Sequence, residues 1–99
     1  MRLRWQPAAL EDRAAIMDYI GEDNPAAAVE LDEAFEALAD QVRQRPELYK
    51  AGRVGGTREC VVRSNYIMAY RIADDSVEIL RVLHAARRWP NTTGRGGVR

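Results

Sequence analysis

Two helical segments meet at Asp23-Asn24-Pro25 with almost no linker, and this junction constrains the fold more than any other feature. Pro25 disfavours helical geometry at Asn24. It is tolerated at the first position of a new helix, where Asn24 can act as the N-cap. The sequence therefore predicts one helix over 8–23 and another over 25–45. Because the connection is so short, the two helices must form an antiparallel hairpin.

Apolar residues recur at helical spacing in both segments and predict one buried stripe on each helix. In the first segment the stripe consists of Leu10, Ala14, Met17 and Ile20, with Ile16 at its edge. In the second it consists of Ala27, Ala28, Leu31, Ala34, Phe35, Leu38 and Val42. The carboxylates expected to face solvent are Asp32, Glu33, Glu36 and Asp40.

Four short segments have the composition and alternation of β-strands. They cover 2–6, before the helices, and 58–63, 66–72 and 77–84 after them. The last three are joined by connections short enough to be hairpin turns. The helical hairpin must bury its apolar stripe, and one face of a sheet is the available partner. The predicted fold is therefore a two-layer α+β domain, in which an N-terminal strand and a helical hairpin pack on a small antiparallel sheet.

Length and composition exclude several classes of protein. Ninety-nine residues fit one domain, expected over 1–90, and the glycine-rich stretch 91–99 is expected to be a flexible tail. The single Cys60 excludes an intrachain disulfide and a multi-cysteine metal site. The sequence has no apolar run of membrane-spanning length and no signal-peptide core, so we expect a cytoplasmic protein without a membrane partner. We expect no metal and no cofactor.

The charge is zero overall but unevenly divided, with 15 basic and 15 acidic residues. Residues 1–50 hold 6 basic and 11 acidic residues, giving −5, and residues 51–99 hold 9 and 4, giving +5. The zero total argues against a non-specific nucleic-acid binder. The second half can still carry a local basic patch. The alternative is that the helices are acidic outside and the strands carry arginine, with no partner implied.

Arginine is the residue type most able to provide a site. Arg81 lies inside an apolar strand, where simple alternation places it on the face of Val77 and Ile79. Such a charge is costly unless a carboxylate pairs with it, Glu59 or Glu78 being candidates, or unless it faces an open groove. It is therefore either a structural clamp or part of a cationic groove for phosphate or an acidic partner. Cys60, inside a strand, is interpreted as a small core residue.

Several strings of residues together resemble one family. They are Gly56-Thr57-Arg58-Glu59, Asn65-Tyr66-Ile67 and Arg81-Val82-Leu83-His84-Ala85-Ala86-Arg87-Arg88-Trp89-Pro90. Their order and spacing, over residues 3–90, are similar to the RelE/ParE superfamily of toxins of type II toxin–antitoxin modules. The resemblance implies a helical hairpin on a small sheet, and a ParD- or RelB-like antitoxin as partner.

The family divides by target, since RelE-like members cut mRNA in the ribosome and ParE-like members poison DNA gyrase. Metal-free RNA cleavage needs a base, an acid and cations for the phosphorane. RelE-like enzymes supply lysine and arginine from the middle strands, where this chain has Cys60, Val61, Val62 and Ile67. The Arg-Val-Leu-His…Arg ending is more similar to the ParE branch. The resemblance therefore favours a gyrase poison that is not an enzyme.

Two alternatives remain open at this point. One is a RelE-like ribonuclease whose catalytic residues would be Arg81, His84 and Arg87, with His84 as general acid. The other is a degenerate member that binds its antitoxin without activity of its own. The residues expected to bind partners are Arg58, Arg63, Arg81, Arg87, Arg88 and Trp89. Trp89 beside two cations is either an anchor on a partner surface or a cap on the core.

Overall fold

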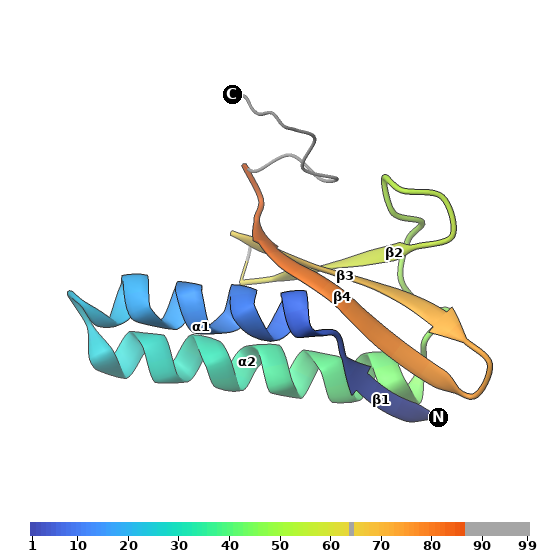
Figure 1. Cartoon of the computed structure of the whole chain (residues 1–99), viewed down its shortest axis with the longest axis horizontal. Helices are drawn as coiled ribbons and strands as arrows, with labels where there is room; N and C mark the ends of the chain where they lie inside the picture. The colour runs from blue at the N-terminus through green and yellow to red at the C-terminus, as the bar shows by residue number, and fades with distance from the viewer. Residues whose placement is uncertain (64, 87–99) are drawn as a thin grey trace.

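The chain alternates one strand, two helices and three strands, as predicted (Figure 1). A computed structural model describes residues 1–63 and 65–86. The elements are β1 (Arg2–Trp5), α1 (Pro7–Gly21), α2 (Pro25–Gln44), β2 (Arg58–Val62), β3 (Tyr66–Ala73) and β4 (Ser76–His84). The predicted α+β class is confirmed, and the predicted bounds differ from the observed ones by one or two residues. No helix of the described residues is long and apolar enough to cross a membrane.

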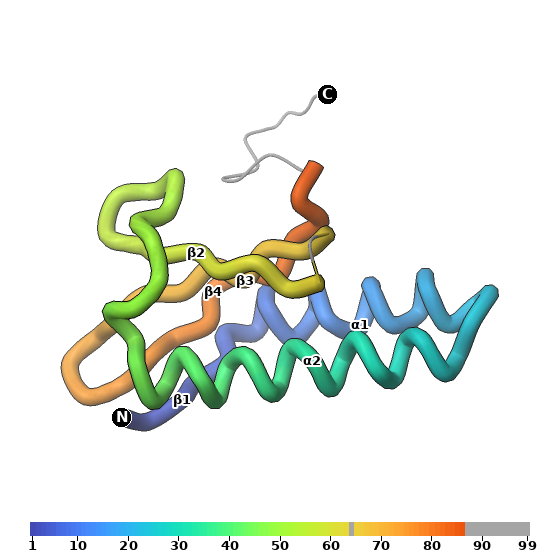
Figure 2. The backbone as a smooth tube through the Cα atoms, turned by 180° about the vertical axis from the view of Figure 1, so that it is seen from behind, coloured from blue at the N-terminus to red at the C-terminus, as the bar shows by residue number. Residues whose placement is uncertain are grey.

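The sheet has the strand order β1-β4-β3-β2, and the helical hairpin covers one of its faces (Figure 2). Strands β2, β3 and β4 form an antiparallel meander, whereas β1 pairs with β4 in parallel. The sheet is therefore mixed rather than wholly antiparallel. The helical hairpin is a long crossover that returns the chain to its starting end. Consequently β2 runs in the direction of β1, and two hairpin turns later β4 does as well.

The junction between the helices has the predicted caps. Proline occupies the start of both helices, and the Asn24 side chain accepts a hydrogen bond from the Ala27 amide at 3.1 Å. This bond satisfies one of the amides that a helix N-terminus leaves unpaired. The buried face of α2 contains four residues of the predicted stripe, Ala28, Leu31, Phe35 and Val42, together with Ala39, which was not predicted.

The predicted core face of α1 is correct at Ile20 and at its edge, Ile16, but wrong at Leu10 and Ala14. Leu10 is 49% exposed and Ala14 is also exposed, whereas Ala9, Ile16 and Ile20 face the core. The cause is Arg13, which lies among these residues with its side chain only 12% exposed. A charged residue inside the stripe shifts the apparent apolar periodicity of the sequence.

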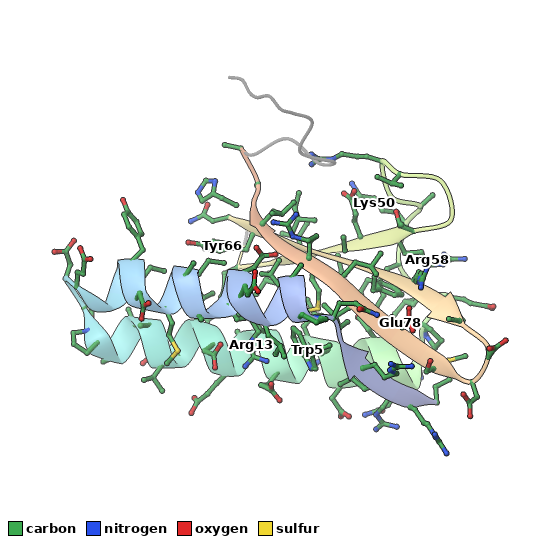
Figure 3. The ribbon with its side chains drawn as sticks, viewed as in Figure 1. Trp5, Arg13, Lys50, Arg58, Tyr66 and Glu78 are labelled. Atoms are coloured by element: carbon green, nitrogen blue, oxygen red, sulfur yellow. The ribbon has the colours of Figure 1, made fainter. Side chains whose placement is uncertain are left out.

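Arg13 can be buried because three side chains interact with its guanidinium group. Its guanidinium carbon lies 4.4 Å from the centroid of the Trp5 ring, and Figure 3 shows the two side by side. It also hydrogen-bonds to Asp32 and Glu36 of α2. Of these two carboxylates, both predicted to face solvent, Glu36 is 58% exposed and Asp32 only 25%. Burial works to lower the pKa of Arg13, but the hydrogen bonds to the two carboxylates outweigh it and raise that pKa.

The core lies between α2 and the sheet, and its largest fully buried side chains include Tyr70, Phe35 and Met68. The Tyr70 hydroxyl donates to the Pro46 carbonyl at 2.5 Å, which fixes the segment after α2. Cys60 is 4% exposed within this core, and burial raises its pKa to about 12. The thiol is therefore a packing group, as the sequence indicated.

One irregularity in β4 overturns a predicted face. Tyr70 pairs with Ile79 and Ala69 pairs with Arg81, so Leu80 is an extra residue in a β-bulge. Beyond the bulge the alternation is inverted. Arg81 therefore lies on the face opposite Ile79, not on the same face as predicted, while Val82 joins the face of Ile79. His84, expected on the face of Glu78, lies with Val82 on the helix-covered face.

Candidate functional site

The edge of β4 changes its neighbour halfway along the strand. β1 pairs only with Ser76 to Ile79, and the Gln6 amide donates to the Ile79 carbonyl at 2.9 Å where that pairing ends. Beyond this point α1 lies beside β4 (Figure 1). Side chains of α1, rather than a strand backbone, therefore meet the second half of β4.

Asp12 of α1 holds this second half. Its carboxylate accepts from Arg81 Nε at 2.8 Å, from Arg81 Nη2 at 3.0 Å and from the Val82 amide at 2.9 Å. The side chains of Arg81 and Asp12 are 25% and 11% exposed. The hydrogen bonds from Asp12 raise the pKa of Arg81, against the opposing effect of burial. We call this arrangement the Asp12 clamp.

The clamp confirms that a carboxylate holds Arg81, but the partner is neither Glu59 nor Glu78. Buried Glu59 accepts from the Arg53 amide at 3.0 Å and lies 3.5 Å from Arg53 Nε. Buried Glu78 accepts from Arg71 Nε at 2.7 Å and lies 3.8 Å from Arg4 Nη1. Both predicted partners are therefore occupied by nearer arginines. Asp12 is 69 residues from Arg81 in sequence, and no local pattern points to it.

A groove of about 240 Å³ opens beside the clamp, between α1 and the end of β4. Its lining consists of Asp12, Ala15, Ile16, Tyr19, Tyr66, Val82 and His84. The rings of Tyr66 and His84 meet edge to face with centroids 5.3 Å apart, and Tyr66 packs in the same way on Phe35 at 5.8 Å. His84 Nδ1 accepts from the Ala86 amide at 3.1 Å. The groove is thus mainly apolar and aromatic; sequence reasoning missed both Tyr19 and Asp12.

Arg58 and Arg63, the other predicted arginines within the described residues, do not line this groove. Arg58 Nη1 donates to the carbonyls of Tyr49 at 2.7 Å and Glu47 at 3.4 Å, so it ties the segment after α2 to β2. Arg63 is exposed just after β2, with a left-handed φ of 55°. Arg87, Arg88 and Trp89 lie outside the described residues. Among the predicted residues that the structure describes, His84 lines the groove, whereas Arg81 lies on the opposite face of β4 and is held by Asp12.

RNA cleavage needs cations for the developing phosphorane, and the described lining of the groove holds no arginine or lysine. Arg81 directs Nε and Nη2 at Asp12, and its charge is offset there, so it is a poor donor to a developing phosphorane. Among residues 1–63 and 65–86 no three His, Cys, Asp or Glu side chains are grouped so as to hold a metal ion.

Comparisons with known proteins agree on one family. The sequence model of the ParE toxin of the type II toxin–antitoxin system parDE matches residues 3–89. Y4kP of Sinorhizobium fredii, which is named as a toxin, is 39% identical over 90% of this chain and 93% of its own. Toxin RelE2 of Caulobacter vibrioides is 40% identical over 84% of this chain and 93% of its own.

Solved structures give the same picture. The fold is similar to that in the chromosomal ParDE system from P. aeruginosa, with a TM-score of 0.77 at 20% identity over 85% of this chain and 95% of that chain. It is also similar to the RelBE2 toxin–antitoxin complex from Mycobacterium tuberculosis, with a TM-score of 0.53 at 31% identity over 84% and 95%. With most of its length matched by the family model, this chain belongs to the ParE toxins of type II toxin–antitoxin systems, within the RelE/ParE superfamily.

Proposed function

We propose that the chain arrests growth by poisoning DNA gyrase and is neutralised by direct binding of a cognate antitoxin. The observation that carries this proposal is the match of the ParE toxin model to residues 3–89, nearly the whole chain. The pairing of Arg81 with Asp12 supports this proposal, because a gyrase poison needs a binding surface and not a cationic catalytic centre. On this proposal the protein is not an enzyme.

The surface offered to an antitoxin is best supported at the β2 edge. There Val61 is 57% exposed, and exposed Arg63 follows at the end of the strand. Leu48 is 64% exposed beside a second groove, at the end of α2. An extended antitoxin segment could add to this edge through its backbone. Its acidic residues would then meet exposed Arg63, whereas Arg58 Nη1 and the Arg81 guanidinium already donate within the domain.

A second candidate function is ribosome-dependent mRNA cleavage. It is favoured by the 40% identity to a protein named Toxin RelE2 and by the meeting of His84 and Tyr66 in one groove. In that case His84 would serve as general acid, with Arg87 as the remaining cation. A third possibility is a degenerate member that binds antitoxin and has no toxic activity.

The three functions separate in one experiment in cells. The chain is induced with and without the neighbouring antitoxin gene, and thymidine and methionine incorporation are followed over the first minutes. We expect growth arrest with DNA synthesis falling first, and full rescue by the antitoxin. An early loss of methionine incorporation would instead favour mRNA cleavage. Uninterrupted growth with soluble, antitoxin-bound protein would indicate the degenerate member.

A further inference from the structure

The groove beside the Asp12 clamp is suited to one large apolar side chain. Its volume of about 240 Å³ is below the ~300–1,000 Å³ typical of small-molecule pockets. Its lining includes the rings of Tyr19, Tyr66 and His84 and the small or aliphatic side chains of Ala15 and Val82. Tyr19 is 76% exposed, an unusual state for a large aromatic side chain. An aromatic ring placed here would be stacked on several sides.

An acidic stripe runs along α1 next to the groove. Glu11, Asp18 and Glu22 are exposed and follow one another at intervals of seven and four residues, so they share one side of the helix. Ala15 continues the same row and also lines the groove. None of the three carboxylates forms an ion pair with a residue in 1–63 or 65–86. The rim of the groove is therefore available to cations.

The chain itself continues beyond His84, a lining residue of this groove, with a segment that is basic and contains a tryptophan. His84 lines the groove, and Ala86, two residues later, is the last described residue. Beyond it, 87–99 holds four arginines and no acid, and Trp89 follows Ala86 by three residues. Three residues span roughly 10 Å when extended. A tryptophan flanked by two arginines can therefore reach the groove and its acidic rim without help from another molecule.

We propose that residues 87–90 dock on α1 of the same chain, with Trp89 in the groove and Arg87 and Arg88 against the acidic stripe. The indole contributes most of the binding because it leaves water for an aromatic site. The exposed ion pairs contribute less and mainly fix the direction of the segment. A segment tethered so closely has a high effective concentration, which favours it over a separate partner of the same chemistry. The inference concerns the isolated toxin and does not depend on its cellular target.

The test uses the full chain labelled with 5-fluorotryptophan and observed by ¹⁹F NMR. The chain has two tryptophans, Trp5 and Trp89, and Trp89→Phe assigns the signals. We expect the Trp89 signal to be displaced from that of free 5-fluorotryptophan and insensitive to exchange of H₂O for D₂O. Ala15→Phe fills the groove and should return this signal to the free position. Ala14→Phe, the same exchange at a neighbouring exposed alanine outside the lining, should leave it displaced.

The unfolding temperature and the Trp5 signal report whether each variant keeps its fold. If Ala15→Phe disturbs either of them, Tyr19→Ala replaces it, since removal of an exposed ring opens the groove without loading the core. A Trp89 signal already at the free position in the unmodified chain would overturn the proposal. An equal response to Ala14→Phe and Ala15→Phe would do so as well. A displacement that disappears on dilution would make a second copy the occupant and overturn docking within one chain.

Discussion

The two halves of β4 are neighbours in one strand but are held in different ways. Ser76 to Ile79 is covered by β1 through a continuous backbone ladder. Arg81 to His84, beyond the bulge at Leu80, is covered by side chains of α1. A ladder satisfies every backbone group along an edge, whereas one side chain satisfies one or two. The groove opens where the ladder stops, so the candidate binding surface arises from the change of neighbour.

Two adjacent residues of α1, Asp12 and Arg13, support the second and the first half of β4, respectively. Asp12 clamps Arg81 and the Val82 amide in the second half. Arg13 covers Trp5, whose strand flanks the first half at Ile79. Successive side chains on a helix point about 100° apart. A single turn of α1 can therefore support a closed region and the border of an open one, and the following variants test this division.

The largest effect is expected from Asp12→Ala. It leaves the Arg81 guanidinium partly buried without its carboxylate and removes the acceptor of the Val82 amide. We expect a loss of about 3 kcal/mol of unfolding free energy in urea titrations. Asp18→Ala is the matched control, because this acid of the same helix is exposed and forms no ion pair with a described residue. It should cost less than ~0.5 kcal/mol. Equal losses in the two variants would mean that the clamp does not hold β4.

A smaller loss, about 2 kcal/mol, is expected from Arg13→Ala, through the lost stacking on Trp5 and the lost hydrogen bonds. The effect should stay below that of Asp12→Ala, since Asp32 and Glu36 are 25% and 58% exposed and can be rehydrated. Arg13→Lys should recover only part of the loss, because an ammonium lacks the planar fork. Full recovery by lysine would show that charge alone, not stacking, places this residue.

Alkaline pH should lower the unfolding free energy through Tyr70 of β3, which pairs with the first half of β4. Burial, with a contribution from Cys60, raises the pKa of Tyr70, the partner of Ile79, to about 12. The unfolded chain loses this proton near pH 10, so the stability that the neutral phenol contributes is present below pH 10 and is lost as the pH rises to 12. Unfolding titrations at pH 8 and pH 11 should show a smaller difference for Tyr70→Phe than for the unmodified chain.

Tyr70→Phe has its own cost at neutral pH, about 1 kcal/mol, since the hydrogen bond to the Pro46 carbonyl is lost. Cys60, whose pKa burial also raises to about 12, accounts for part of the alkaline slope that remains. Cys60→Ala should therefore reduce that slope further. A slope unchanged by either substitution would mean that other groups govern alkaline unfolding.

The smallest effect is expected from deletion of 91–99. We propose that the folded domain ends near residue 90 and that this glycine-rich stretch has too little apolar content to dock. Unfolding free energy should change by less than ~0.5 kcal/mol and growth arrest should persist. A deletion that abolishes growth arrest while the unfolding free energy is unchanged would place a target contact inside 91–99.

Local sequence signals predicted most of the fold because the chain marks its elements clearly. Asn24 and Pro25 set the start of the second helix, and alternation located β2, β3 and β4 within one or two residues. The core face of α1 was predicted only in part, because Arg13 occupies a buried position that composition assigns to solvent. The bulge at Leu80 was also invisible, since one extra residue leaves no compositional trace.

The candidate site was only partly predictable for a related reason. Arg81 and His84 were identified from the strand and from the family resemblance, and a paired state for Arg81 followed from the cost of burying a charge. The partner Asp12 and the groove residue Tyr19 come from α1, far away in sequence. Their contact with β4 depends on where β1 stops. That end point is a property of the assembled sheet and not of any one segment.

Gyrase poisoning is tested most directly with purified components. The chain, freed from its antitoxin, is incubated with gyrase and relaxed plasmid, and in parallel with ribosomes translating a defined mRNA. We predict loss of supercoiling with accumulation of cleaved plasmid, its reversal by added antitoxin, and intact mRNA. Unimpaired supercoiling together with cut mRNA would contradict the proposal and place this chain among the ribosome-dependent nucleases of the superfamily.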